Sequence, residues 1–240
     1  MKTQVQWAKA GYFLITGILL LIWPAKAARA DEEYNFSWLD PDKKIYVLQN
    51  RRYQKAKHIM LSVTGGLGNA SAYRNTINIE PRASYYFSEA FGFEAFFNYN
   101  FNSENDTLDA LRNAVGSTPV LPVIRQVASQ AGLLFVWAPW YSKINVFNSI
   151  LYFDWFFTLG AGMTNTEVET RNSFAADSNL VKESLFSIFW GTGHQYHVNE
   201  WFKVRVDFTA SHYRAPIFGI TGDETWFDNY NFNIGVGFQL

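Results

Sequence analysis

Histidines are the first candidates for chemistry. Two of the four, His194 and His197, lie three residues apart in the stretch HQYH. On a helix this spacing would place both imidazoles on one face, where they could share a metal ion, but on a strand an odd spacing separates them. The chain has no cysteine, which excludes disulfides and thiolate ligands. Because the flanking residues alternate as a strand does, we expect no metal site and no cofactor.

A possible nucleophile comes next. The segment ASHYRAP, residues 210–216, resembles the lipid A deacylase signature, in which a strand carries His-x-Ser with the serine as nucleophile. Here Arg214 stands where that serine belongs. Ser211 precedes His212 and would point to the opposite side of a strand. Because nucleophilic catalysis needs a base within hydrogen-bond reach of the hydroxyl, we predict that the chain is not an enzyme.

A third set of candidates consists of charged side chains that would share one face of their strands. If that face lines a narrow barrel, four acids and three bases must pair, since an unpaired buried ion is costly. Two interpretations stay open: a salt-bridged plug, or a polar pathway for ions. Bulky Tyr152 and Phe189, predicted on the same side, favour the plug. The seven charged residues are Glu80, Arg82, Glu94, Asp154, Lys203, Arg205 and Asp207.

The elements that must position these residues show a period of two. One face is rich in Gly, Ser, Thr and Asn, and the other in Phe, Trp and Leu. A soluble sandwich would carry Lys and Glu on its polar face, whereas small polar residues suit a narrow lumen and large apolar ones suit lipid. We therefore predict an all-β fold, a transmembrane antiparallel β-barrel of eight strands in an up-and-down meander. The predicted strands are 57–68, 75–86, 91–102, 129–138 (apolar on both faces), 150–163, 185–198, 201–213 and 230–240.

The connections alternate in length, as expected of outer-membrane barrels with short periplasmic turns and longer outer loops. Aromatic residues cluster beside the inward turns and predict an interfacial girdle. The predicted outward links are 69–74, 103–128, 164–184 and 214–227, and the inward links are 88–90, 139–149 and 199–200. The girdle residues are Phe87, Phe91, Trp137, Trp140, Tyr141, Tyr196, Trp201 and Phe202.

The longest outward link, 103–128, predicts a short amphipathic helix over the barrel mouth. Asp106 is the expected N-cap and Gly116 the expected end. Its apolar face either packs on the rim and the lipid headgroups or contacts another protein or surface. The apolar positions at helical spacing are Leu108, Leu111 and Val115.

The N-terminus predicts export. Lysines precede an apolar run, 11–23, that is too short to cross a bilayer and is followed by two Ala-x-Ala sites. We predict a signal peptide over 1–30, cleaved after residue 27 or 30, a periplasmic segment over 31–56 and the barrel over 57–240. The basic run from Lys43 to Lys57 is expected to be solvated or to face headgroups.

The chain resembles the outer membrane beta-barrel domain family of the deltaproteobacterial type, and its architecture is similar to that of the OmpA-like and OmpX-like eight-stranded barrels. The stretches that carry the likeness are 43–66, 85–97, 133–147 and 150–162. The resemblance implies the fold and the outer membrane of a Gram-negative cell, with membrane lipid and lipopolysaccharide as partners. It implies little about activity.

The C-terminal pattern Asn233-x-Gly235-x-x-Phe238-x-Leu240 resembles the signal read by the outer-membrane insertion machinery. A net charge of -1 gives no reason to expect nucleic acid, and a monomer is the default. Two functions remain: a structural or interaction barrel with a plugged polar lumen, which presents its outer loops and residues 103–128 in particular, or a narrow channel for small solutes or ions.

Overall fold

The computed structural model describes residues 51–69, 71–114, 123–147, 149–170, 179–217 and 223–240. The predicted signal peptide, both cleavage sites and residues 31–50 lie outside these ranges. The described residues form eight strands and one helix: β1 (Ile59–Gly68), β2 (Arg74–Tyr86), β3 (Phe91–Glu104), α2 (Asp106–Ala114), β4 (Ile124–Val146), β5 (Ser149–Thr170), β6 (Asn179–His197), β7 (Phe202–Pro216) and β8 (Glu224–Gln239).

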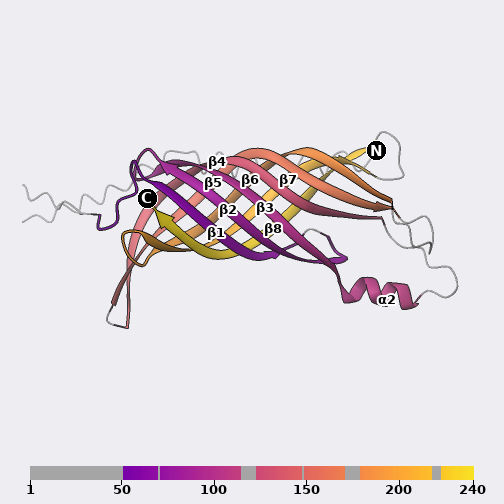
Figure 1. Cartoon of the computed structure of the whole chain (residues 1–240), viewed down its shortest axis with the longest axis horizontal. Coiled ribbons are helices and arrows are strands. Elements are labelled where there is room, and N and C mark those ends of the chain that lie inside the picture. Colours follow the sequence, from indigo (N-terminus) through magenta and orange to yellow (C-terminus); the bar gives the residue numbers. More distant parts are fainter. Residues whose placement is uncertain (1–50, 70, 115–122, 148, 171–178, 218–222) are drawn as a thin grey trace, which may run out of the picture. The chain divides into compact units, whose positions relative to one another are not determined.

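The strands form a closed barrel in sequence order, in which each strand pairs antiparallel with its neighbours and β8 pairs with β1 (Figure 1). This confirms the predicted eight-stranded meander. The closing pair runs from Met60 opposite Gln239 to Gly68 opposite Asn231. One residue further, the Leu240 N–H donates to the Ile59 carbonyl at 2.8 Å. Closure removes the free strand edges that an open sheet would leave.

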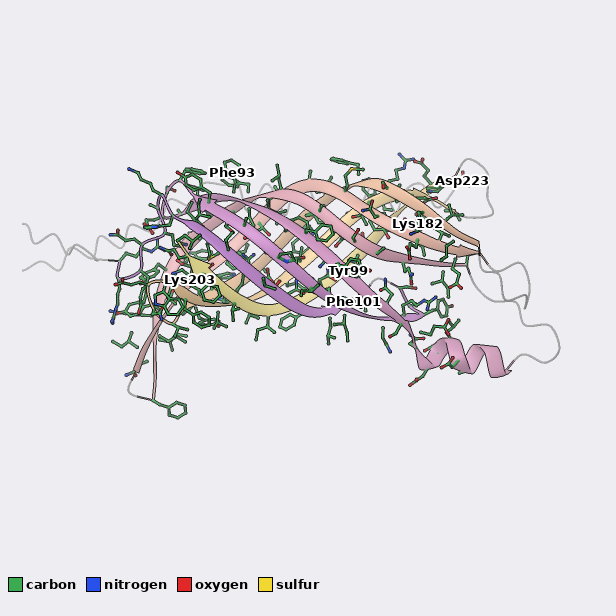
Figure 2. The ribbon with its side chains drawn as sticks, in the orientation of Figure 1. Phe93, Tyr99, Phe101, Lys182, Lys203 and Asp223 are labelled. Carbon is green, nitrogen blue, oxygen red and sulfur yellow. The ribbon has the colours of Figure 1, made fainter. Side chains whose placement is uncertain are left out.

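Alternation along each strand decides which side chains face inward. In β3 the residues are exposed and buried in turn, as a strand with two unlike environments requires. Phe93, Tyr99 and Phe101 stand on the outside of the barrel (Figure 2), with 56%, 47% and 58% of their surfaces exposed. Glu94 and Asn98, between them, are fully buried. The interior is therefore polar and the exterior apolar.

Most strands are longer than predicted, and the longest are β4 with 23 residues, β5 with 22 and β6 with 19. The predicted inward link 139–149 is wrong, because β4 continues to Val146 and β5 begins at Ser149. Strands also extend into both ends of the long outward links, which are therefore shorter than predicted. The extensions lack the period-two contrast of the central segments, so the sequence pattern ends before the backbone pairing does.

The barrel has two unlike ends. At the end that we call the turn end, the links are 87–90, 147–148 and 198–201, and β8 finishes there. At the opposite end, the loop end, the links are 69–73, 105–123, 171–178 and 217–223.

An apolar band surrounds the barrel between these ends. In β7 the outward side chains are apolar from 202 to 210 and then change to His212, and in β8 they are apolar from 238 back to 230 and then change to Asp228. These spans match the roughly 9–11 residues of a transmembrane β-strand. The polar residues that end the outward stripes of the other strands towards the loop end include Asn75, Ser103, Ser129, Asn165 and Ser184.

The predicted helix is present as α2, with its cap one residue earlier than expected. Asn105, not Asp106, caps it, since the Leu108 N–H donates to Asn105 Oδ1 at 3.1 Å. Leu108 is only 1% exposed. Figure 1 shows α2 to one side of the barrel and not across its mouth, contrary to the prediction. Among the described residues, no helix has the length and apolar character needed to cross a membrane.

Candidate functional site

The seven charged residues singled out in the sequence all lie inside the barrel, and none is more than 4% exposed. They separate into two groups, and the second group also contains Arg51, Lys55 and His197, which are not among the seven. We call them the central cluster, which consists of Glu80, Arg82, Glu94, Arg205 and Asp207, and the basal cluster, which consists of Arg51, Lys55, Asp154, His197 and Lys203.

Glu94 is the hub of the central cluster. Arg205 donates to both of its carboxylate oxygens, with Nη1 2.5 Å from Oε2 and Nη2 3.0 Å from Oε1. Arg82 Nη1 donates to Oε1 at 2.5 Å. The Ser84 hydroxyl donates to Oε2 at 2.7 Å. Bidentate guanidinium–carboxylate pairs of this kind are among the strongest hydrogen bonds in proteins.

The rest of the central cluster shares the same two guanidinium groups. Asp207 Oδ2 lies 3.0 Å from Arg82 Nη2 and 3.0 Å from Arg205 Nη2. Arg82 also pairs with Glu80, whose carboxylate accepts from Asn98 Nδ2 at 2.9 Å. Three carboxylates therefore share two guanidinium groups, and the contacts join β2, β3 and β7 across the lumen. Such burial is tolerated only when the ions are paired and hydrogen-bonded.

Asp154 organises the basal cluster near the turn end. Its Oδ1 lies 2.5 Å from Arg51 Nη2, and its Oδ2 lies 3.0 Å from Lys55 Nζ and 2.6 Å from His197 Nε2. The other ring nitrogen, His197 Nδ1, lies 3.0 Å from Lys203 Nζ. A lysine ammonium can only donate. This network therefore assigns a neutral imidazole to His197, with its proton on Nε2 facing Asp154.

The segment before β1 completes the basal cluster, which corrects a prediction. We expected the basic run up to Lys57 to be solvated or to face headgroups, but Lys55 is 2% exposed and Arg51 is largely buried. The reason is the buried Asp154, which requires cationic partners. Residues 43–50 of that run lie outside the described residues. Burial lowers the pKa of the Lys55 ammonium, and the Asp154 carboxylate opposes that shift.

Glu89, in the link between β2 and β3, holds this segment from the turn end. Its carboxylate accepts the Lys55 N–H at 3.1 Å and the Ala56 N–H at 3.0 Å, and lies 3.0 Å from Arg51 Nη1. Tyr141, predicted in the girdle, is instead covered by the Arg51 guanidinium, 4.3 Å from its ring centre. A β-bulge between Trp137 and Trp140 shifts the alternation of β4, so that Tyr141 faces the lumen side, where it makes this cation–π contact.

The loop end is narrowed by an apolar group, the upper core, made of Val127, Tyr213 and Ala215 with Leu185 and Phe227 packed against it. The rings of Tyr213 and Phe227 stack with centres 5.8 Å apart. Arg125 lies over Phe227 and pairs with Glu183 at 2.5 Å. The sequence did not indicate this group, because Val127, Ala215 and Phe227 lie in predicted links, and Leu185 and Tyr213 lie at the ends of predicted strands.

One side of the lumen is lined by amides. The side chains of Asn78, Asn229 and Asn233 are buried, and neither polar atom of these three amides has a hydrogen-bond partner within the described part of the chain. Register places Asn233 and Asn78 on either side of Gly66, across β8, β1 and β2, and Asn229 lies four residues from Asn233 along β8, towards the loop end. We call these three residues the amide patch.

The histidines of HQYH lie on opposite faces, as predicted from a strand. His197 is in the basal cluster, whereas His194 faces outward against Trp155, with ring centres 5.4 Å apart. His212 also faces outward, with Nδ1 2.5 Å from Asp228 Oδ1 and Nε2 accepting from Trp190 Nε1 at 2.8 Å. Ser211 points into the lumen. No group of three potential metal-ligating His, Cys, Asp or Glu side chains occurs in the described ranges.

The predicted insertion signal forms the closing strand β8. Asn233 is fully buried in the lumen, and Phe238 faces outward and stacks on Trp201 at 5.9 Å. Leu240 is 70% exposed. At Gly235 a Cβ atom would lie 2.1 Å from the Val63 carbonyl oxygen and 2.5 Å from Thr64 Cα, so only glycine allows β8 and β1 to approach here.

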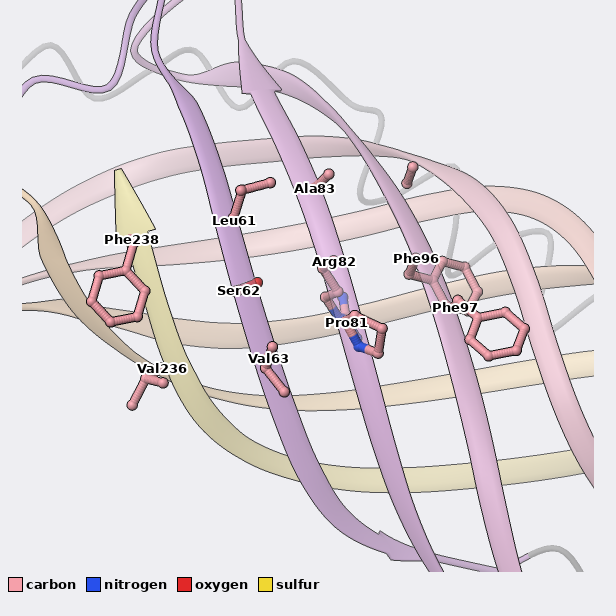
Figure 3. A pocket seen from close by; sticks show the side chains of 11 residues that line it. Leu61, Ser62, Val63, Pro81, Arg82, Ala83, Phe96, Phe97, Val236 and Phe238 are labelled. Carbon is pink, nitrogen blue, oxygen red and sulfur yellow. The ribbon is translucent and has the colours of Figure 1, made fainter. Parts of the chain in front are cut away.

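The outer surface has a hollow of about 540 Å³ over β1, β2, β3 and β8 (Figure 3). Small outward residues form its floor, namely Pro81, Ala83 and Ala95, while larger ones such as Phe97 and Phe238 form its walls. It opens within the apolar band and therefore belongs to the outer apolar surface.

A closed eight-stranded barrel with an apolar exterior and buried ion pairs inside defines the class of transmembrane β-barrels. The chain belongs to the outer membrane protein beta-barrel domain family, whose model matches residues 52–239. Barrels of this class have short periplasmic turns and longer outer loops, and the turn end carries the shorter links, as expected of a periplasmic end.

Comparison with curated proteins gives no match. Similar solved structures include the N-terminal β-barrel domain of Pseudomonas aeruginosa OprF, at 11% identity over 78% of this chain and 100% of that chain, with a TM-score of 0.43. Ail of Yersinia pestis is 13% identical over 76% of this chain and 97% of that one, with a TM-score of 0.42. Neisserial surface protein A is 8% identical over the same shares, with a TM-score of 0.48.

Proposed function

We propose that this outer-membrane barrel has a lumen closed to solutes and acts as a structural or interaction protein through its loop end. The central cluster carries the proposal. Five charged side chains from three strands meet in the lumen, all at most 4% exposed, and are joined by short ion pairs. Opening a path through them would separate buried ions, which typically costs several kcal/mol.

The two ends add to this closure. The basal cluster fills the lumen near the turn end with residues of the segment before β1, and the upper core narrows the loop end. An interior of eight strands is just wide enough for side chains. With no catalytic arrangement proposed, the working surface is the loop end, where residues 103–128, including α2, would meet an external protein or surface.

A narrow channel is the second candidate, and the amide patch favours it. Buried amides are normally hydrogen-bonded, often by ordered water, and Asn78, Asn229 and Asn233 lack protein partners among the described residues. A file of water along β8, β1 and β2 would give small ions a polar route beside the central cluster.

Cysteine accessibility distinguishes the two candidates, because the chain has no native cysteine. We would introduce Ser62→Cys and Ser187→Cys, both at buried lumen positions (4% and 0% exposed), and Ser103→Cys, at an exposed position, as control. Each refolded variant would be treated with a small water-soluble thiol reagent. If the lumen is closed, we expect rapid reaction only at position 103. Rapid reaction at both 62 and 187 would establish a water-filled route and replace the closed lumen by the channel.

We also propose that the chain is exported to the outer membrane. Residues 1–30 would be removed as a signal peptide after residue 27 or 30, and the barrel would be inserted in a Gram-negative outer membrane through its C-terminal signal and surrounded by lipid and lipopolysaccharide. The intact mass of protein purified from outer membranes would identify the cleavage site. A mass that retains residues 1–30 would contradict cleavage.

A further inference from the structure

The β4–β5 hairpin extends beyond the barrel at the turn end. Strand β3 pairs with β4 only as far as Trp137, and β6 pairs with β5 only from Tyr152 onward. Strands β4 and β5 continue to pair with each other until Val146 opposite Ser149. Residues 140–152, which we call the anchor hairpin, are therefore a two-stranded ribbon that leaves the ring. Ribbons of this kind are marginally stable in water unless one face is covered.

A β-bulge sets the direction of the anchor hairpin. Between Trp137 and Trp140 the register shifts, so that Ala138 and Pro139 together oppose a single residue of β5. Bulges bend the strand that carries them and are common at barrel rims. Figure 1 shows the hairpin leaving the barrel sideways, so that its far end lies outside the outline of the ring.

The outward face of the anchor hairpin is apolar and continues the apolar band. Trp140 and Trp155 pair across the strands with ring centres 5.1 Å apart and are 50% and 39% exposed. Further along, Ile144 pairs with Leu151 and is 45% exposed. Phe147, where the chain turns with φ 46°, is 100% exposed. Ser142, opposite Phe153, is the one polar residue between Trp140 and Ile144 on this face. A hairpin surrounded by water would gain nothing from such a stripe.

The bend at the bulge determines which way the apolar face of the anchor hairpin points. The outward face of an upright barrel strand points sideways into lipid, and a strand that bends away from the barrel axis turns that same face towards the membrane plane. We propose that the anchor hairpin lies against the inner leaflet of the outer membrane, with Trp140, Ile144 and Phe147 in the interface. Its other face then holds the lumen side: Tyr141 stacks on Tyr152 and lies under Arg51.

Neighbouring residues of β4 provide a matched test, because Ile144 and Asn145 lie on opposite faces of one strand. Ile144→Cys and Asn145→Cys would each be labelled with an environment-sensitive fluorophore and refolded in vesicles of phosphatidylethanolamine and phosphatidylglycerol. We expect nitroxide lipids to quench the label at 144 several-fold more than that at 145, and soluble iodide to do the reverse. Heat-modifiable gel migration checks that both variants fold. Leu151→Cys, opposite Ile144, replaces it if that variant does not.

Equal iodide quenching at 144 and 145, without lipid quenching, would place both faces in water and overturn the proposal. Shielding of 144 in native envelopes but not in pure lipid vesicles would identify a protein partner, and would overturn it as well. The result does not depend on whether the lumen conducts.

Discussion

Glu94 illustrates how single residues close this barrel. It is fully buried and accepts hydrogen bonds from Arg82, Arg205 and Ser84 at once. Its charge holds two guanidinium groups that would otherwise repel each other in a confined space. The central cluster therefore depends on Glu94 more than on any peripheral pair.

Replacing this carboxylate, Glu94→Gln, should destabilise the folded barrel by about 3–5 kcal/mol, because it leaves two buried cations with fewer partners. The measurement is the urea midpoint of the barrel refolded in vesicles. Lys182→Gln is the control, since Lys182 pairs with Glu167 on the surface and its side chain is 77% exposed. Surface pairs contribute little, so its midpoint should not change. Equal midpoints for Glu94→Gln and the original chain would contradict this role.

Two glycines of β8 offer a second residue-scale comparison. Gly235→Ala should cost about 1–3 kcal/mol through overpacking, since its Cβ would meet backbone at 2.1 Å. Gly237→Ala, two residues further on, meets nothing nearer than 3.3 Å. The folded fraction of each variant, measured by heat-modifiable migration after refolding, should fall only for Gly235→Ala. A similar loss for both would show that close β8–β1 approach is not the cause.

For single residues, the sequence predicted which face of a strand a side chain occupies, but not which other side chains it contacts. Period two was enough to place Glu94 and Arg205 on one face of their strands. It could not show that Asp154 would recruit Arg51 and Lys55, because those contacts join residues about 100 positions apart and depend on the register of intervening strands. His197, three residues from His194, was considered only as a metal ligand and became a partner of Asp154.

Among the elements, the segment 51–57 is the one whose role changed most. It was expected to be solvated or to face headgroups, yet its backbone is held by the Glu89 carboxylate and its side chains reach Asp154. The lengths of most strands were also underestimated, and those of β4 and β5 most of all. The lipid-facing band imposes the alternation of apolar and polar residues, and that contrast weakens in the strand extensions, so the sequence pattern ends before the strands do.

The substitution Glu89→Ala removes the carboxylate that accepts the Lys55 and Ala56 N–H groups, and it should loosen this segment without unfolding the barrel. Hydrogen bonds to charged groups contribute about 1.5–3 kcal/mol, so amide exchange at Lys55 and Ala56 should accelerate by about tenfold or more. Hydrogen exchange resolved by mass spectrometry measures it. Glu200→Ala, at the exposed turn between β6 and β7, is the control and should leave exchange over 51–57 unchanged. Unchanged exchange in Glu89→Ala would show that other contacts hold the segment.

For the whole molecule, three layers follow one another along one lumen: the basal cluster, the central cluster and the upper core. β7 contributes to all three, but each layer has its own side chains, so no single substitution removes all three. The outer surface matches this arrangement, with an apolar band in the middle and polar residues beyond it. The class of the molecule was predictable because all the predicted strands except 129–138 repeat the same alternation. Closure of the lumen depends on side-chain packing between strands, which no single strand contains.

The most direct test of this account is the conductance of the refolded chain in a planar lipid bilayer, with folding verified by heat-modifiable migration. A closed lumen predicts no discrete openings in the original chain. The double variant Glu94→Ala/Arg205→Ala removes the central hub and should give at most small openings, because the other two layers remain. Discrete, salt-dependent openings from the folded original chain would contradict the account and make the amide patch the conducting route.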